Sequence, residues 1–197
     1  MEASGIEQLL RAFRWEILQR MYGCAHSSII GFISSEWINQ CECNSVLDGA
    51  PCPIIGQGRT GQKHADILLC KDNKPFIVVE VETGIGKYEE KLDSILSYLH
   101  NGKDFIGLEF GLLIMSNFVA GNLKYRHNWE SKEIKTKVDK AEDTIALVSI
   151  EKLRIPSDNS VLGRLRSRND YYPWEIENID CRIHTANRNV ERNLWKK

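Results

Sequence analysis

The segment PFIVVEVET, residues 75–83, is an apolar strand that ends with two glutamates. Side chains alternate between the two faces of a strand, so one face carries Phe76, Val78, Glu80 and Glu82, and the other carries Ile77, Val79 and Val81. Apolar residues on both faces predict a strand buried inside a sheet that is covered on both sides. A buried carboxylate costs several kcal/mol unless a cation compensates it, so this strand also predicts a positive partner near its end.

A second strand-like run, HADILLC at 64–70, precedes this segment and predicts an antiparallel hairpin. A three-residue connection, 72–74, would set Asp66 opposite Glu80, with β-carbons about 4.5–5.5 Å apart. A two-residue turn would instead set Asp66 opposite Val79, on the other face, unless a bulge restores the match. The meeting of the two carboxylates therefore depends on the register of the hairpin.

The rest of the chain predicts further helices and strands. Ser4 and Glu7 form a capping box, and apolar residues at helical spacing predict one amphipathic helix over 4–22. In chain order, the remaining patterns predict a strand or buried helix at 27–38, a long connection at 39–63, a helix at 86–100, a strand at 110–117, a helical stretch from 131 to 140 and a strand at 144–150. This order predicts an α/β fold with a central mixed β-sheet flanked by helices.

Length and composition predict one main domain. The chain has 197 residues, of which 42% are hydrophobic, and this suffices for one well-packed core. We expect the core to span residues 1–153. A C-terminal extension over 154–197 mixes arginines with aromatic residues in no clear period. This pattern fits either a segment that packs on the core and contacts nucleic acid or a solvated tail with a few anchors into the core.

The charge balance and hydropathy limit the classes of partner. The 27 acidic residues nearly cancel the 26 basic ones, so a nucleic-acid site must be a local concentration of positive charge. No run approaches the roughly 18 apolar residues of a membrane span, and the first residues lack the pattern of a secretory signal. We therefore expect a cytoplasmic protein with no membrane partner.

The six cysteines predict reduced thiols, because no signal peptide accompanies them. One group falls within a short stretch and could hold a zinc ion with His26 as a further ligand: Cys24, Cys41, Cys43 and Cys52. Paired C-x-x-C motifs are absent, so the alternative is a set of cysteines scattered through a loop and the core.

The hairpin resembles the bipartite signature of the PD-(D/E)XK nuclease superfamily. HAD at 64–66 is followed, after the turn, by EVE at 80–82. Asp66 matches the metal-binding aspartate of that superfamily and Glu80 matches its second carboxylate. Ala65 replaces the usual proline, and Glu82 stands where a lysine is usual. The resemblance implies a restriction-endonuclease-like core, and its specific part covers only the hairpin.

The resemblance also implies a reaction. Asp66 and Glu80 would bind Mg²⁺ or Mn²⁺, which suits a pair of carboxylates and supports hydrolysis of DNA phosphodiester bonds. Glu82 would act as a general base or as an additional metal ligand. Some members supply the missing lysine from the helix after the signature strand, where Lys87 and Lys91 stand, and Lys87 would stabilise charge on the phosphate.

Further residues are secondary candidates for this site. His64 lies opposite Glu82 in the three-residue register, although a packed or solvated histidine is the more ordinary interpretation. Glu16 could add a carboxylate if the first helix covers the sheet edge, but an exposed position is the more ordinary interpretation. The arginines that could contact successive phosphates of DNA are Arg164, Arg166 and Arg168.

Three classes of function follow from the sequence. The first is a magnesium-dependent deoxyribonuclease, for example a type II restriction endonuclease that acts as a homodimer on a palindromic site. The second is a nucleic-acid-binding module on a nuclease-like scaffold that has lost catalysis, as Glu82 in place of lysine suggests. The third is a zinc-stabilised interaction protein, as the grouped cysteines suggest.

Overall fold

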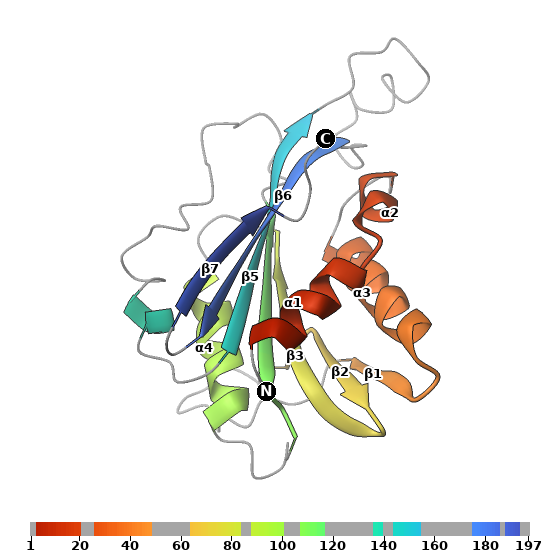
Figure 1. Cartoon of the computed structure of the whole chain (residues 1–197), viewed down its shortest axis with the longest axis vertical. Coiled ribbons are helices and arrows are strands. Elements are labelled where there is room, and N and C mark those ends of the chain that lie inside the picture. The colour runs from red at the N-terminus through yellow and green to blue at the C-terminus, as the bar shows by residue number, and fades with distance from the viewer. Residues whose placement is uncertain are drawn as a thin grey trace.

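The computed structural model describes residues 3–20, 26–48, 64–83, 88–100, 107–116, 136–139, 144–154, 175–185 and 188–193. Its strands form one seven-stranded sheet in which every strand pairs with its neighbour in sequence (Figure 1). The strands are β1 (Asn44–Asp48), β2 (Ile67–Lys71), β3 (Lys74–Glu82), β4 (Phe110–Ser116), β5 (Thr144–Arg154), β6 (Glu175–Thr185) and β7 (Arg188–Asn193). Strands β3, β4 and β5 are parallel, and the other neighbours are antiparallel. The prediction of an α/β fold with a mixed sheet is confirmed.

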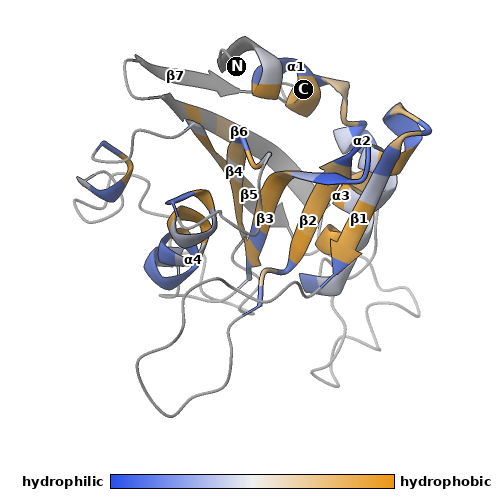
Figure 2. Ribbon diagram, turned by 90° about the horizontal axis from the view of Figure 1, so that it is seen from below, coloured by the Kyte–Doolittle hydropathy of each residue, from blue (hydrophilic) through white to orange (hydrophobic). Residues whose placement is uncertain are grey.

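Helices cover both faces of the sheet (Figure 2). One face packs against α1 (Ala3–Ala12), α2 (Trp15–Arg20) and α3 (His26–Gln40), and the other packs against α4 (Tyr88–His100). The alternation expected for β3 explains this arrangement, because Val79 contributes to the first core and Val78 to the second. Within the described ranges, every helix falls short of the length and apolar content that a membrane span requires.

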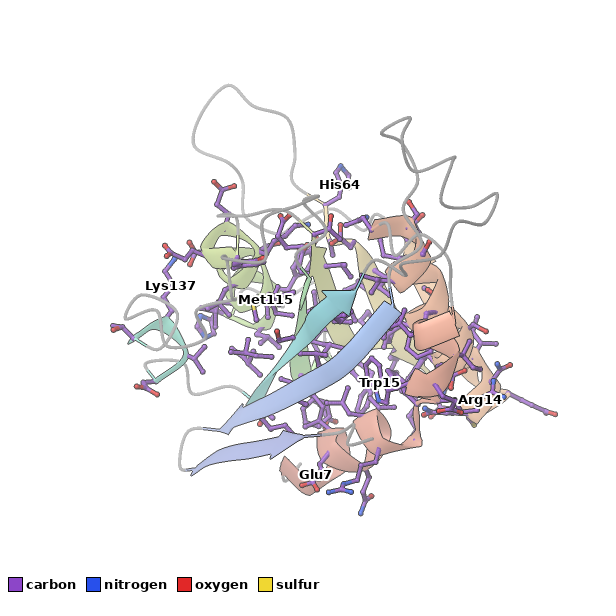
Figure 3. The ribbon with its side chains drawn as sticks, turned by 90° about the horizontal axis from the view of Figure 1, so that it is seen from above. Glu7, Arg14, Trp15, His64, Met115 and Lys137 are labelled. Carbon is purple, nitrogen blue, oxygen red and sulfur yellow. The ribbon has the colours of Figure 1, made fainter. Side chains whose placement is uncertain are left out.

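The single helix predicted over 4–22 is wrong, because the chain breaks into α1 and α2 at Phe13 and Arg14. The backbone N–H of Arg14 donates to Oε2 of Glu36 on α3 at 2.9 Å, and the Arg14 guanidinium pairs with the same carboxylate. The break turns Leu18 inward and leaves Ile17 37% exposed. Figure 3 shows Arg14 on the outer side of the helices and Trp15 against the core. A contact 22 residues away in sequence therefore ends α1.

Three other segments differ from, or resolve, the sequence prediction. The undecided segment at 27–38 is helical and belongs to α3, whereas the long connection predicted at 39–63 contains the edge strand β1. The segment beyond 154 contributes β6 and β7, which pair antiparallel and extend the same sheet from β5. The expected boundary between residues 153 and 154 falls inside β5, one residue before its end.

The β2–β3 hairpin combines a two-residue turn with a bulge. Lys71 pairs with Lys74, and the two turn residues between them have positive φ, 53° at Asp72 and 59° at Asn73. Both values fit a type I′ turn, which favours tight hairpins. The register then shifts between Leu69 and Cys70, so that Leu68 faces Val78 and Ile67 faces Val79. Continuing this register sets Asp66 opposite Glu80.

The bulge also corrects one predicted side-chain position. Phe76 is the extra residue of β3, between the partners of Cys70 and Leu69. It packs with the α1–α3 core rather than on the face of Val78, and its ring stacks on Trp37 with centroids 6.0 Å apart. The three-residue connection is thus wrong, while the face shared by Asp66 and Glu80 is retained.

The hairpin turn gives a first testable prediction. Replacing Asn73 with Ala should lower the free energy of unfolding by about 1 kcal/mol, because the short polar side chain of asparagine tolerates the left-handed backbone at φ 59° better than that of alanine does. Replacing Asn73 with Gly should leave stability unchanged or raise it slightly. Urea unfolding followed by circular dichroism measures both. Equal loss in the two variants would show that the asparagine side chain, not the backbone conformation, matters.

Candidate active site

Two carboxylates meet at one lysine on the face of the sheet that α4 covers. The Nζ atom of Lys91 lies 2.9 Å from Oδ2 of Asp66 and 2.6 Å from Oε2 of Glu80. The Glu80 side chain is 1% exposed, Asp66 is 13% exposed and Lys91 is 25% exposed. The group therefore opens to solvent on the side of Asp66 and Lys91, and Glu80 forms its floor.

Three elements position these side chains. Asp66 immediately precedes β2, Glu80 lies near the carboxyl end of β3, and Lys91 stands in the first turn of α4. The bulged hairpin sets Asp66 and Glu80 side by side, and α4 returns over them on its way from β3 to the parallel strand β4. Ligand sites in sheets with parallel strands are common beyond the carboxyl ends of those strands, which is where this group lies.

Asp66 is held as a carboxylate by three donors. Its Oδ2 accepts hydrogen bonds from the backbone N–H of Val81 at 2.7 Å and from Lys91, and lies 3.2 Å from Nε2 of His26. Burial acts to raise the pKa of Asp66, but the bonds from His26, Val81 and Lys91 outweigh it and lower the pKa to about 2. Asp66 is thus ionised at neutral pH. The same contact with Asp66 raises the pKa of His26.

Glu80 titrates near neutrality, in contrast with Asp66. The hydroxyl of Ser94 donates to its Oε1 at 2.6 Å, and Lys91 donates to its Oε2. Burial is the largest influence and raises the pKa of Glu80 to about 7, even though Lys91 and Ser94 act in the opposite direction. Burial alone would lower the pKa of Lys91, but the two carboxylates reverse this and raise it. One ammonium therefore pairs with two carboxylates.

Removing the lysine should change the titration of Glu80. In Lys91→Met we expect the pKa of Glu80 to rise above about 7, because burial then acts without its main opposing charge. Carboxyl-carbon NMR measures this shift. The control is Lys137→Met. Lys137 pairs at 2.7 Å with Asp93, which lies on α4 as Lys91 does, and not with Glu80. A pKa of Glu80 that stays the same in Lys91→Met would contradict the contact.

The remaining predicted residues take varied positions. Glu82 is the last residue of β3 and is half-buried. Burial is the main cause of the raised pKa of Tyr88, and the charge of Glu82 raises it further. The same charge makes a small contribution to the raised pKa of His26, of which Asp66 is the main cause. His64 is exposed and points outward at the start of the hairpin (Figure 3). Glu16 is exposed on α2. In the parts of the chain that the structure describes, no three His, Cys, Asp or Glu residues are grouped as metal ligands, so Glu82 does not join Asp66 and Glu80.

Several predicted residues lie outside the described residues: Lys87, Arg164, Arg166, Arg168, Cys24 and Cys52. The zinc set with His26 is nevertheless wrong in part. His26 is the first residue of α3, and Cys41 directly follows the last residue of that helix. A helix of 15 residues is about 22 Å long, so His26 and Cys41 cannot bind one ion. His26 contacts Asp66 instead.

The pair of carboxylates fits a hard divalent cation. Oδ2 of Asp66 and Oε2 of Glu80 already converge on one positive atom, the Nζ of Lys91. Mg²⁺ and Mn²⁺ are commonly bound by one or two protein carboxylates, with water and substrate phosphate completing the shell. Zinc fits less well, because the group offers neither a thiolate nor a free imidazole.

Sequence reasoning missed His26 and Ser94 as members of this group and favoured Lys87 over Lys91. A signal for the α4 residues existed, because Lys91 and Ser94 are three residues apart and flank the apolar stripe that contains Leu92 and Ile95. Residues at this spacing on the helix face that covers β3 are able to reach Glu80. His26 carried no comparable signal, since the helix it begins was not assigned from sequence.

Comparison with known protein families, with curated proteins and with solved structures finds no match to this chain. Function is therefore inferred from the chemistry of Asp66, Glu80 and Lys91. A buried acid that titrates near neutrality beside a specific charged partner is typical of functional sites.

Proposed function

We propose that this protein is a metal-dependent endonuclease that hydrolyses DNA phosphodiester bonds, with Asp66 and Glu80 as metal ligands and Lys91 as the cationic side chain of the site. The observation that carries the proposal is the convergence of both carboxylates on Nζ of Lys91. Their approach requires the bulge in the hairpin, which places Asp66 on the face of Glu80. An ordinary surface ion pair would need neither the bulge nor the burial of Glu80.

The order of elements also supports this proposal. Helix α3 precedes an antiparallel β1–β2–β3 meander, and α4 then crosses to the parallel strand β4. The PD-(D/E)XK superfamily, which the hairpin sequence resembles, combines a helix, a mixed sheet and a second helix after the signature strand. The two carboxylates occupy that hairpin.

Lys91 offers an explanation for glutamate at position 82. The superfamily usually carries a lysine there, and some members supply it from the following helix. Lys91 reaches both carboxylates from α4, so the lysine can be lost from β3 without loss of the positive charge. Glu82, half-buried at the end of β3, remains the candidate general base, and Lys87 a candidate for stabilising the phosphate.

Each residue of the group has a role in the proposed reaction. Asp66 and Glu80 would hold Mg²⁺ or Mn²⁺, which supplies polarisation of the phosphodiester and a lower pKa for a bound water. Lys91, released from the carboxylates, would neutralise negative charge on the phosphate. Ser94 orients Glu80 through Oε1, and His26 orients Asp66. Glu80 would give up its proton to bind the cation.

We further propose that the substrate of this site is DNA. Arg164, Arg166 and Arg168 would contact successive phosphates and position the duplex. A type II restriction endonuclease would form a homodimer so that two such sites cut a palindrome. Base-specific contacts would come from other groups of the chain.

One observation favours a second function, a nucleic-acid-binding module without catalysis. Lys91 already satisfies both carboxylates with bonds of 2.9 and 2.6 Å, so the group is internally paired. A scaffold that had lost metal binding would be stabilised in this way.

Plasmid cleavage separates the two functions. The purified chain should nick or linearise supercoiled plasmid with Mg²⁺ or Mn²⁺ and leave it intact with a chelator. Gel-shift measurements on the same sample report DNA affinity. Binding without cleavage over a range of plasmid sequences would favour the inactive module, and stoichiometric zinc by elemental analysis would favour a zinc-stabilised protein.

A further inference from the structure

Cys41 and Cys43 lie side by side on the surface, between the end of α3 and the start of β1. Both thiols are free and exposed, and their Sγ atoms are 2.9 Å apart. Two backbone bonds fix the turn: the N–H of Asn44 donates to the carbonyl of Cys41 at 3.0 Å, and the N–H of Asp72 donates to the carbonyl of Cys43 at 3.1 Å. The turn between α3 and β1 therefore holds two adjacent thiols at the protein surface.

We propose that Cys41 and Cys43 form a reversible dithiol–disulfide couple that exchanges with low-molecular-weight disulfides such as glutathione disulfide. The sulfurs need only a small approach to reach the S–S bond length of about 2.05 Å. Their backbone contacts lie at one edge of the sheet, at the far end of α3 from His26. The couple is therefore independent of the proposed nuclease site.

The exchange proceeds in two balanced steps. The Cys41 thiolate attacks one sulfur of glutathione disulfide, a mixed disulfide forms, and one glutathione leaves as its thiolate and takes up a proton. The Cys43 thiolate then attacks the Cys41 sulfur, the Cys41–Cys43 bond forms, and the second glutathione leaves. Two protein thiols are oxidised, and one glutathione disulfide is reduced to two glutathione molecules.

The electrostatics of the pair assign the order of attack. A hydrogen bond from Cys43 lowers the pKa of Cys41, and the same contact, with burial and Asp72, raises the pKa of Cys43 to about 11. Cys41 is thus the thiolate that reacts first. Once Cys41 is in the mixed disulfide, its negative charge is gone, and the main cause of the high pKa of Cys43 is removed. Cys43 then resolves the intermediate.

The test uses the reduced full-length chain, glutathione disulfide, acid quenching and peptide mass spectrometry. We expect the wild type to gain the Cys41–Cys43 bond and to lose two alkylatable thiols, and dithiothreitol to restore both. Cys43→Ser should lose the bond and accumulate glutathione on Cys41. In the wild type, limiting alkylation should label Cys41 before Cys43. Cys70 and Cys181, which are buried, serve as internal controls that stay alkylatable after unfolding.

Three outcomes would overturn the proposal. The first is stable glutathione on the wild-type pair without an intrachain bond. The second is a disulfide between either thiol and another cysteine of the chain. The third is stoichiometric zinc that protects both thiols from glutathione disulfide. Cleavage of DNA is not the readout, so the result stands apart from the nuclease test.

Discussion

Asp66→Asn and Glu80→Gln are each expected to reduce Mg²⁺-dependent plasmid cleavage by about 10³-fold or more. Each removes one of the two carboxylates that converge on Lys91. A catalytic metal contributes several kcal/mol to the transition state, and each loss of about 1.4 kcal/mol lowers the rate tenfold. Initial nicking rates at saturating Mg²⁺ measure the effect. Undiminished cleavage in either variant would remove that residue from the essential ligands.

Asp93→Asn is the matched control, because Asp93 is 54% exposed on α4 and pairs with Lys137 rather than Lys91. It should cleave like the wild type. Thermal unfolding measured over a range of pH shows whether a variant loses cleavage because a metal ligand is gone or because the fold is less stable. The pKa of Asp66 is lowered to about 2, so its ionised form stabilises the fold above pH ~4, and this contribution disappears between about pH 4 and 2.

The titration of Glu80 changes folding stability with pH in the opposite direction. Its pKa is raised to about 7, so the folded state holds the proton more tightly than the unfolded chain, and stability falls as pH rises from about 4 to 7. Glu80→Gln removes this dependence and should be at least as stable as the wild type at pH above about 7. Asp66→Asn should lose the stabilisation that the wild type shows above pH ~4.

Gly111→Ala is expected to lower the free energy of unfolding by about 1–3 kcal/mol, in spite of the usual benefit of Ala over Gly. Gly111 lies in β4 beneath α4, and a Cβ there would overlap Cγ2 of Ile95. That methyl is attached directly to a branched Cβ, so it cannot swing aside easily. The helix must move off the sheet, and Lys91 and Ser94 move with it. The free energy of unfolding measured in urea and the rate of plasmid cleavage should therefore both fall.

Gly31→Ala provides the matched control for this substitution. Gly31 is exposed on α3, and a Cβ there meets nothing within 4 Å. The change should stabilise the protein by roughly 0.5–1 kcal/mol, the usual preference for Ala in a helix. If Gly111→Ala were equally stabilising, α4 would not sit close to β4, and the position assigned to Lys91 would be in doubt.

The sequence predicted those elements whose own residues carry the pattern. Strands β2 and β3 are apolar, and α4 presents a regular stripe, so both were found within a few residues of their ends. Edge strands were missed because they need little apolar surface: β1 has only five residues, of half-buried or exposed character. The break between α1 and α2 was missed because Glu36, on another helix, causes it.

The same distinction applies to the candidate site. Asp66 and Glu80 were predicted because both lie on one hairpin, where strand geometry relates their positions. Their partners come from elsewhere: His26 begins a helix that precedes the hairpin, and Ser94 follows it on α4. Such contacts depend on how helices dock on a sheet, and local periodicity does not encode docking. Lys91 was within reach of prediction, but its choice over Lys87 required the start of α4.

The bulge at Phe76 constrains how the hairpin can change during evolution. Between the two-residue turn and the carboxylates, β2 carries five residues, 67–71, whereas β3 carries six, 74–79, and the bulge takes up this difference of one residue. Deleting Phe76 would make the two sides equal, so that Asp66 would face Glu80 without a bulge. A one-residue deletion within 67–71 would instead increase the difference to two residues. Homologues that share the two carboxylates and a two-residue turn are therefore expected to carry both the extra residue and the bulge, or to lack both.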